Sequence, residues 1–529
     1  MKRLILLSIL MLGFYFLSKS ENVYRACGLQ SGIWNYDTVY ITCDVSIPNG
    51  ETLHIESGTR VVFNGHYSVQ VQGTIKAIGT AADSIIFRVS DTSGFGNIHS
   101  TQGGWKGIKF IETAPENDSS SFEYCVFTSG KAVGDSINSY GGAIFVSSSS
   151  KLSIRHSTFK NNYAFYWGGA VYAFKSNILM EHCRITQNVA GNDGMVYGYG
   201  GGLCFVASLP NLRFMRLDNN SSTGIGGGAS FESSNPLLLN CIIENNYSGL
   251  GGGLGFLRAT PDRMISNLLL RYNEARFFGG GIANINATPV ISNSTIIENT
   301  AAMGGGFYCN ESSHTKLYNS ILWNNTSYDT LGSQVWIWDV FSEPGFYNCA
   351  IQGGIPLFGG SSFHGEYIAN TELNPLFVDA QQGDFRLLAG SPCINSGTNT
   401  PENITLPIND LDLHSRIMYA TIDMGAYEYQ GYVGVGWMQN EEFRASVYPN
   451  PLTCKSVIEV ESNVDTDILF TLRSNDGKQL VQHRSFLMKL EKNKLPLTAI
   501  NIEIEKLKRG IYVLEISNKK QRLLLKLIQ

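Results

Sequence analysis

The chain has 529 residues and a formal net charge of −5, and 16% of its residues are charged while 56 are glycine. This length suggests three or four domains, and the slight acidity argues against a nucleic-acid partner. The low charged fraction and abundant glycine suit a solenoid.

The first twenty residues have the pattern of a secretory signal peptide. Lys2 and Arg3 precede an apolar run from Leu4 to Leu17. That run is too short to span a bilayer comfortably, and no later segment is long and apolar enough. Residues 1–20 are therefore predicted to be a signal peptide, and the chain is expected to be exported, soluble and without a transmembrane segment.

Residues 21–121 contain short alternating strands, such as VYITCDVSI and TRVVFNG, without a repeated phrase. They are predicted to form N-terminal capping coils that cover the exposed first edge of a solenoid. Cys27 and Cys43 are candidates for a disulfide, since the chain is exported, but the sequence leaves open whether they are bridged.

Residues 122–365 are predicted to be repeat coils. A nine-residue phrase starts nine times, at Phe122, Ile154, Met180, Leu212, Leu238, Ile265, Ile291, Leu317 and Phe346, with spacings of 26 to 32 residues. Such a period indicates stacked units, each burying its apolar face against its neighbours.

The first and sixth positions of the phrase are apolar, and the fourth is small in most copies. Fourth and sixth positions share a strand face, because side chains alternate, whereas the parity changes between first and fourth and predicts a bend there. The fourth-position cysteines are predicted to be buried free thiols in one inward row, since serine replaces them in other copies: Cys125, Cys183, Cys241 and Cys349.

Most phrases end on asparagine, and a glycine run follows. The asparagines are predicted to form a hydrogen-bonded ladder, and the glycines to allow a sharp corner. The aromatic residue third after the last glycine is predicted to stack from coil to coil as one ladder, formed by Phe145, Tyr172, Phe205, Phe231 and Phe256.

The paired motifs FKNN at Phe159 and GGAVY at Gly168 resemble the repeats of polymorphic outer-membrane adhesins. The repeat as a whole resembles the right-handed parallel β-helix of the pectate-lyase-like superfold. The expected fold is all-β: this resemblance implies a right-handed parallel β-helix, and the resemblance of residues 446–529 given below implies a small C-terminal β-sandwich after it. It predicts the fold and not the activity, because this superfold carries lyases, hydrolases, adhesins and inert stalks alike.

Residues 366–430, with NPLFVD and GDFRLLAGSPCINSGTN, resemble the choice-of-anchor Q region and are predicted to be a C-terminal cap. Leu413 stands where that family has glycine after its D-x-D. Asp410, Asp412 and Asp423 are therefore expected to build turns and not to bind calcium.

Residues 431–445 contain the glycine-rich VGVGW and are predicted to be a linker. Residues 446–529 resemble the type IX secretion C-terminal sorting domain through VYPNP, NDGK, LKRGIYVLEI and the terminal LLLKLIQ. The resemblance implies the type IX secretion machinery as partner and a cell-surface or extracellular location. The implied sorting signal comprises Tyr448, Pro449, Asn450, Pro451, Gly510 and Tyr512.

Catalysis has little support in the sequence. The motifs of pectin hydrolases and pectate lyases are absent, and acidic residues such as Asp218, Glu232, Glu244 and Glu298 are interpreted as solvated. No catalytic residue, metal ligand or cofactor is predicted, although a polysaccharide lyase or glycoside hydrolase remains an alternative.

Binding has better support. Insertions at 131–140 and 189–199, with the intervening turn 163–167, fall at one corner of three consecutive coils. Loops on a rigid solenoid carry function, and aromatic, amide and acidic side chains together can hold sugars. The predicted ligand-binding residues are Asp135, Tyr140, Phe165, Tyr166, Asn192, Asp193, Tyr197 and Tyr199.

The predicted function is adhesion or glycan binding by a monomer, with a polysaccharide or a host surface as the expected partner. Two alternatives limit this prediction. The residues before the glycine runs, from Trp167 to Met303, could simply seal the corner, and the whole protein could be an inert surface stalk.

Overall fold

The structure is a computed structural model that describes residues 21–149, 151–191, 198–328, 331–402, 404–418, 421–430, 438–439, 443–448, 452, 456–462, 465–474, 478–487, 492–508, 511–518 and 522–528. Within these residues the regular elements are β-strands and short 3-10 helices, with no α-helix. The predicted signal peptide and most of the predicted linker lie outside them.

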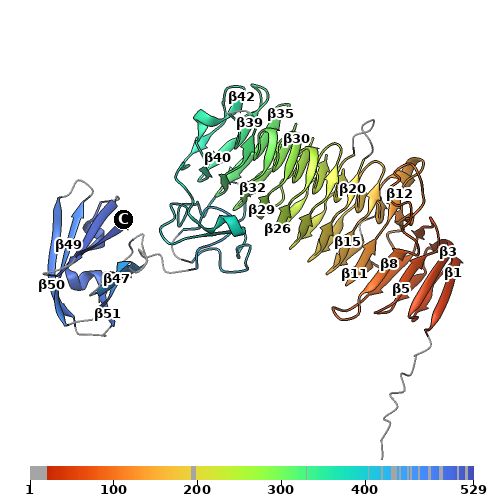
Figure 1. Cartoon of the computed structure of the whole chain (residues 1–529), viewed down its shortest axis with the longest axis horizontal. Helices are drawn as coiled ribbons and strands as arrows, with labels where there is room; N and C mark the ends of the chain where they lie inside the picture. Colours follow the sequence, from red (N-terminus) through yellow and green to blue (C-terminus); the bar gives the residue numbers. More distant parts are fainter. Residues whose placement is uncertain are drawn as a thin grey trace, which may run out of the picture.

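The N-terminal coils and the repeats form one parallel β-helix, whose strands stack in register (Figure 1). Sheet 1 contains β2 (Gly32–Trp34), β4 (Thr52–Ile55), β7 (Thr74–Ile78), β10 (Ser120–Glu123), β14 (Leu152–Arg155), β18 (Ile178–Glu181), β22 (Asn211–Arg213), β26 (Leu237–Glu244), β29 (Ile265–Arg271), β32 (Val290–Ser292), β36 (Lys316–Tyr318), β40 (Gly345–Tyr347) and β43 (Tyr367–Ile368). Sheet 2 contains β1 (Val23–Leu29), β3 (Thr38–Ile47), β5 (Arg60–Phe63), β8 (Ile85–Val89), β11 (Cys125–Thr128), β15 (Thr158–Lys160), β19 (Arg184–Thr186), β23 (Arg216–Asp218), the second halves of β26 and β29, β33 (Thr295–Ile297), β37 (Ile321–Trp323) and β41 (Ala350–Ile351).

Sheet 3 begins at the end of β3 and continues through β6 (Val69–Val71), β9 (Ile108–Ile111), β13 (Ile144–Ser147), β17 (Val171–Phe174), β21 (Leu203–Val206), β25 (Ala229–Glu232), β28 (Leu254–Leu257), β31 (Ile282–Ile285), β35 (Phe307–Asn310), β39 (Val335–Ile337) and β42 (Gly359–Gly360). Sheet 4 lies between sheets 2 and 3 along the chain and contains β12 (Lys131–Ala132), β16 (Tyr163–Ala164), β20 (Val189–Ala190), β24 (Ser221–Ser222), β27 (Tyr247–Leu250), β30 (Glu274–Phe278), β34 (Thr300–Met303) and β38 (Thr326–Ser327).

The coils turn at residues in the left-handed region of backbone space. The third phrase position has a positive φ in all nine copies, for example 48° at Tyr124 and 52° at Asn348. This conformation is uncommon outside glycine and asparagine, and it turns the chain between sheets 1 and 2. The predicted bend is confirmed. A second left-handed residue, such as Asn161, follows sheet 2, and a third, such as Lys175, follows sheet 3.

Polar ladders satisfy the backbone at these corners. Asn188 donates from its backbone N–H (3.1 Å) and from Nδ2 (2.9 Å) to Oδ1 of Asn220 on the next coil, which confirms the predicted asparagine ladder. A serine ladder after sheet 3 was not predicted. There the Ser176 N–H donates to Ser208 Oγ, and the Ser208 N–H donates to Ser234 Oγ, both at 3.0 Å.

The fourth-position cysteines face the interior as free, buried thiols, as predicted. Burial raises the pKa of Cys183 to about 12, so its thiolate is suppressed at neutral pH. Cys27 and Cys43, on β1 and β3, form a disulfide.

The prediction of one aromatic ladder is wrong. Phe145 pairs with Tyr172 and Tyr172 with Cys204 on the outer face of sheet 3, whereas Phe205 pairs with Phe231 in the core. The first two repeats have two glycines where the next three have three, so the third residue after the run changes face. Two separate stacks result.

Residues 374–430 lie against the outer face of sheet 2 from β26 onward. They include β44 (Phe377–Asp379), η3 (Ala380–Gln382) and β45 (Asp384–Leu387). Their apolar side chains share a core with outward residues of the coils, among them Leu269, Ile297, Ile321, Phe385 and Met424. Aromatic residues Phe346, Phe358, Phe363 and Tyr367 pack together at the last coils. Residues 374–430 thus form a cover on the side of the β-helix, called here the lateral cover. Their resemblance to the choice-of-anchor Q region stays a prediction.

The remaining strands form a separate sandwich with a single core. One antiparallel sheet contains β46 (Met438–Gln439), β47 (Phe443–Tyr448), β48 (Val457–Ser462) and β51 (Lys492–Pro496). The other contains β50 (Gln479–Leu487), β49 (Thr466–Ser474), β52 (Ile511–Ser517) and β53 (Arg522–Ile528), with η4 (Leu497–Ile500) and η5 (Ile504–Lys506) beside the strands. The predicted C-terminal β-sandwich is confirmed.

Candidate binding surface

An aromatic corner, defined here as Tyr140, Phe165, Tyr166, Trp167 and Tyr199, lies where sheet 4 leads into sheet 3. The Tyr140 ring lies 5.4 Å from that of Tyr166 and 5.6 Å from that of Trp167, and Trp167 stacks on Tyr199 at 5.1 Å. All five side chains are half-buried, so each combines a packed face with an accessible one. Tyr140 and Tyr199 also cover the outer row of Phe145, Tyr172 and Cys204.

Backbone hydrogen bonds hold this corner rigidly. The Phe165 N–H donates to the Ala132 carbonyl and the Tyr166 N–H to the Ser139 carbonyl, both at 2.9 Å. Burial raises the pKa of the Tyr140 hydroxyl, which therefore stays protonated and can donate a hydrogen bond at neutral pH.

The loop 131–140 has a buried anchor and an exposed tip. Lys131 is buried, and its ammonium donates to the carbonyls of Gly94 (3.1 Å), Asn97 (2.9 Å) and Gln102 (2.8 Å). Asp135 is exposed and precedes η1 (Ser136–Ser139). Loop 91–104, which the sequence did not assign to the corner, thus becomes part of it, and the His99 ring lies 6.3 Å from that of Phe165.

The structure therefore brings together four of the eight predicted ligand-binding residues, Tyr140, Phe165, Tyr166 and Tyr199. A fifth, Asp135, is exposed on the loop that leads to Tyr140. The other three, Asn192, Asp193 and Tyr197, lie outside the described residues. Of the predicted sorting signal, Tyr448 ends β47, and Tyr512 is buried in β52 with its hydroxyl donating to the Lys508 carbonyl at 2.6 Å. Pro449, Asn450, Pro451 and Gly510 also lie outside the described residues.

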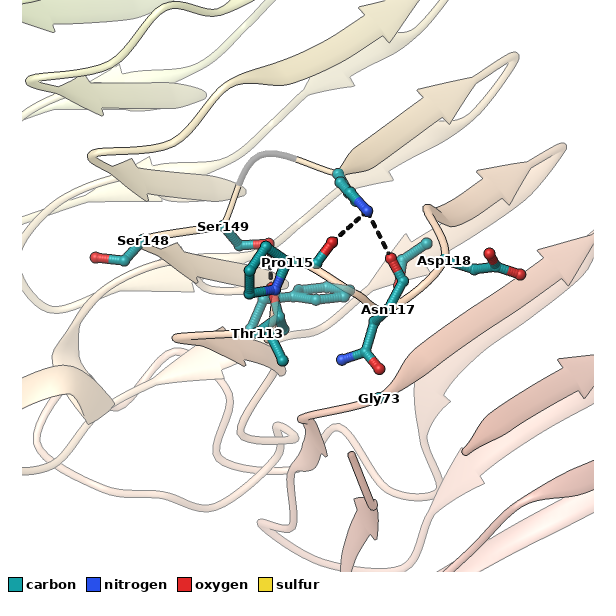
Figure 2. A pocket seen from close by; sticks show the side chains of 11 residues that line it. Gly73, Thr113, Pro115, Asn117, Asp118, Ser148 and Ser149 are labelled. Atoms are coloured by element: carbon teal, nitrogen blue, oxygen red, sulfur yellow. Dashed lines mark hydrogen bonds between the residues drawn. The ribbon is translucent and has the colours of Figure 1, made fainter. Parts of the chain in front are cut away.

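A cavity of about 260 Å³ opens beside the loop 112–118 (Figure 2). Several polar groups that line it are hydrogen-bonded to one another. The Lys151 ammonium donates to the carbonyls of Pro115 and Asn117, and Thr113 Oγ1 donates to Ser149 Oγ at 2.6 Å. These hydrogen bonds between lining residues favour a structural role for the cavity.

The acidic residues of the coils are not all solvated, contrary to the prediction. Asp218 and Glu244 are buried on the outer face of sheet 2. Asp218 accepts from Arg184 Nε (2.9 Å), Arg184 Nη2 (3.0 Å) and Thr186 Oγ1 (2.7 Å). The pKa of Asp218 is lowered because these hydrogen bonds outweigh its desolvation. Glu244 is held by Arg216 and by Arg271.

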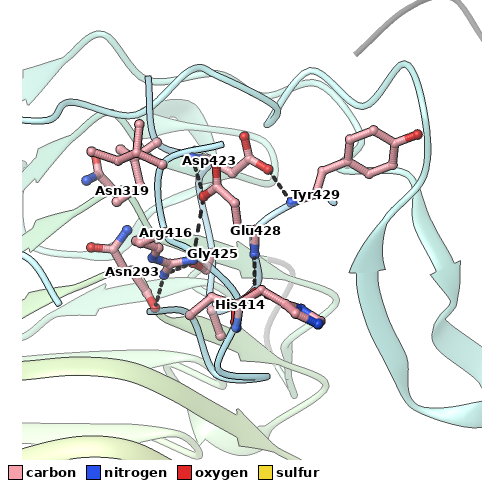
Figure 3. A network of polar contacts seen from close by, with 12 residues as sticks. Asn293, Asn319, His414, Arg416, Asp423, Gly425, Glu428 and Tyr429 are labelled. Atoms are coloured by element: carbon pink, nitrogen blue, oxygen red, sulfur yellow. Dashed lines mark hydrogen bonds and ion pairs between the residues drawn. The ribbon is translucent and has the colours of Figure 1, made fainter. Parts of the chain in front are cut away.

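A second group of buried charges belongs to the lateral cover, where it meets the coils (Figure 3). Arg416 is buried and donates to Gly425 O (2.7 Å) and Asn267 Oδ1 (3.0 Å), with Glu428 at 3.9 Å. Burial raises the pKa of Asp423 and of Glu428. Asp410 accepts from the N–H groups of His414 and Glu428, Asp423 from those of Asn395 and Tyr429. Asp410 and Asp423 therefore build turns, as predicted. Asp412, for which a turn-building role was also predicted, forms an ion pair with Arg386.

Residues 97–257 match the family model "Right handed beta helix region", and residues 446–529 match "Secretion system C-terminal sorting domain". Among solved structures, the enzymatically active domain of tailspike protein 4 from bacteriophage CBA120 is similar at 11% identity, with a TM-score of 0.19, over 90% of this chain and 62% of that one. The comparison with curated proteins gave no match.

The fold and the match to the β-helix family model define the class: the chain is a right-handed parallel β-helix protein. More particularly, its C-terminal domain is a type IX sorting domain, which marks the protein for export and for cell-surface attachment or secretion. No helix in the described part of the chain is long and apolar enough to cross a membrane.

Proposed function

We propose that this exported β-helix protein binds a polysaccharide at the aromatic corner and acts in adhesion without catalysis. The supporting observation is the pair Phe165 and Tyr166, whose rings lie 5.1 Å apart and nearly perpendicular, half-exposed on a hydrogen-bonded backbone. Rigid aromatic side chains give large contact area at low entropic cost, and exposed Asp135, on the loop that leads to Tyr140, can accept hydrogen bonds from hydroxyl groups.

The carboxylates favour binding over hydrolysis. Glycoside hydrolysis needs a protonated acid and a second carboxylate flanking the sugar. On sheet 2, Asp218 has a lowered pKa and is occupied by Arg184. Asp423 and Glu428 have raised pKa values but are buried within the lateral cover.

A glycan array probed with the full exported chain, and scored for both retained protein and released sugar, tests this function. The double variant Phe165→Ala/Tyr166→Ala should lose most binding while its melting temperature stays within about two degrees. Tyr247→Ala, an exposed tyrosine on sheet 4, is the matched control. Release of sugar products would favour a lyase or hydrolase, and no binding to any glycan would favour a structural stalk.

A further inference from the structure

The uncovered part of sheet 2 presents cations to solvent. The basic face is defined here as the outward side chains of β15, β19 and β23: Thr158, Lys160, Arg184, Thr186, Arg216 and Asp218. The side chains of Arg184 and Arg216 are 53% and 47% exposed, while those of their partners Asp218 and Glu244 are 2% and 3% exposed. An incoming molecule therefore meets guanidinium groups, with the compensating carboxylates buried below them.

The guanidinium groups are oriented by those carboxylates. Asp218 accepts from Nε and Nη2 of Arg184, which leaves Nη1 on the side away from Asp218, because the guanidinium is a planar fork. Arg216 contacts Asp218 through Nε at 3.6 Å and Glu244 through Nη2. Arg184 and Arg216 are direct register partners on adjacent strands, so equivalent donors repeat at the strand spacing of about 4.8 Å.

The covered part of the same sheet shows what such an arginine does. Arg271 donates from Nε to Glu244 at 2.7 Å and from Nη1 to the Gly383 carbonyl of the lateral cover at 2.8 Å. Its guanidinium also lies over the rings of Tyr272 and Phe385. An acceptor-bearing segment is thus held on this face through the Nη1 edge of a carboxylate-anchored arginine.

We propose that the basic face binds an anionic polysaccharide running along the solenoid. Its donors repeat once per coil, close to the length of one sugar ring, which suits a periodic polymer with an acidic group on successive sugars. The register partner of Arg184 on the preceding coil is Thr158, and exposed Lys160 lies two residues further along that strand. The rings of His156 and His182 stack on each other at 4.9 Å. Glu181, a half-buried acid nearby, pairs with Arg155 at 3.2 Å. This surface is separate from the aromatic corner.

Binding of the full exported chain to dextran sulfate and to neutral dextran of equal length tests the proposal. Dextran sulfate should bind and dextran should not, and binding should weaken with salt. Arg184→Gln/Arg216→Gln should lower the affinity at least about tenfold, since each lost contact is a charge-assisted hydrogen bond. Arg258→Gln removes a 55% exposed arginine that pairs with Glu232 elsewhere and should change affinity less than about twofold.

Two further variants serve as controls. One tests whether lost binding comes from misfolding, and the other tests whether dextran sulfate binds at the aromatic corner. Arg184→Lys/Arg216→Lys keeps the charge and should retain most binding. Phe165→Ala/Tyr166→Ala should leave dextran sulfate binding unchanged, so failure of the corner and failure of the basic face are distinguishable. Unchanged affinity in the glutamine double variant would overturn the proposal. Equally tight, equally arginine-dependent binding of polyglutamate or single-stranded DNA would overturn the assignment to a polysaccharide.

Discussion

Sheet 2 has two halves with the same backbone register and different outer chemistry. At one outward position the side chains are Thr158, Arg184 and Arg216 in the open half, and Ile242, Leu269, Thr295 and Ile321 where the lateral cover packs. Leu269 and Ile321 are buried, whereas Arg184 and Arg216 are exposed. The inward rows do not change in this way. The type of residue at an outward position therefore depends on what covers that coil, whereas the type of residue at an inward position depends only on the packing inside the coil.

The strongest test places the same charge in each half. Leu269→Asp buries an unpaired carboxylate between sheet 2 and the cover and should destabilise the protein by at least about 3 kcal/mol. Thr158→Asp puts the carboxylate on the half-buried open face and should cost less than about 1 kcal/mol. Equilibrium unfolding measures both, and equal losses would show that the cover does not seal Leu269.

The next test removes the buried cation of the cover. Arg416→Met leaves Asp423 and Glu428 without their cation and should cost about 3 kcal/mol. Limited proteolysis of residues 374–430 should accelerate with it. Arg258→Met on the open surface is the matched control, and comparable losses in the two variants would contradict a special role for the buried charge.

A smaller effect is expected from pH. Burial raises the pKa of Glu428 above its ordinary 4.5. Between these two pKa values, the Glu428 carboxyl is protonated in the folded state and ionised in the unfolded state. The cover should therefore become less stable as pH rises from about 4.5 toward that raised pKa. In Glu428→Gln, the rate of limited proteolysis of the cover should change less with pH between about 5 and 8 than in the parent. An unchanged slope in this variant would assign the dependence to another group.

The smallest effect should be found in the inward row. Cys183→Ser in the open half and Cys349→Ser under the cover should each cost less than about 1.5 kcal/mol, because serine occupies the same position at Ser157 and Ser320. Denaturant unfolding measures the two costs. A much larger loss at Cys349 would show that the cover also constrains the interior.

The repeat made much of the fold predictable. Periodic apolar positions predicted the coils, and the parity change predicted the bend now seen at Tyr124 and its equivalents. The split aromatic stack was missed because one glycine more or less reverses the face of Phe145 relative to Phe205. The lateral cover was expected only as a cap, since nothing local in Phe385 or Met424 shows that they pack on Leu269.

The candidate sites were less predictable. The clustering of Tyr140, Phe165 and Tyr166 was predictable from the loop lengths at one corner. The role of Lys131 was not, because its ammonium binds carbonyls of loop 91–104 that lie 29 to 37 residues earlier in the chain. The burial of Asp218 likewise depends on Arg184 one coil away, beside Arg216 of its own strand. Both are contacts of individual side chains with distant parts of the chain, which a periodic pattern does not specify.

The cysteine row has a consequence for passage through an oxidising compartment. Cys125, Cys183 and Cys241 alternate with Ser157 and Met215 in successive coils. Neighbouring thiols are thus separated by two coil rises, about 9.6 Å, and disulfides cannot bridge Cα atoms more than about 7 Å apart. Once coiled, the chain keeps these three thiols out of reach of one another, so oxidative mispairing among them is confined to the time before the coils stack.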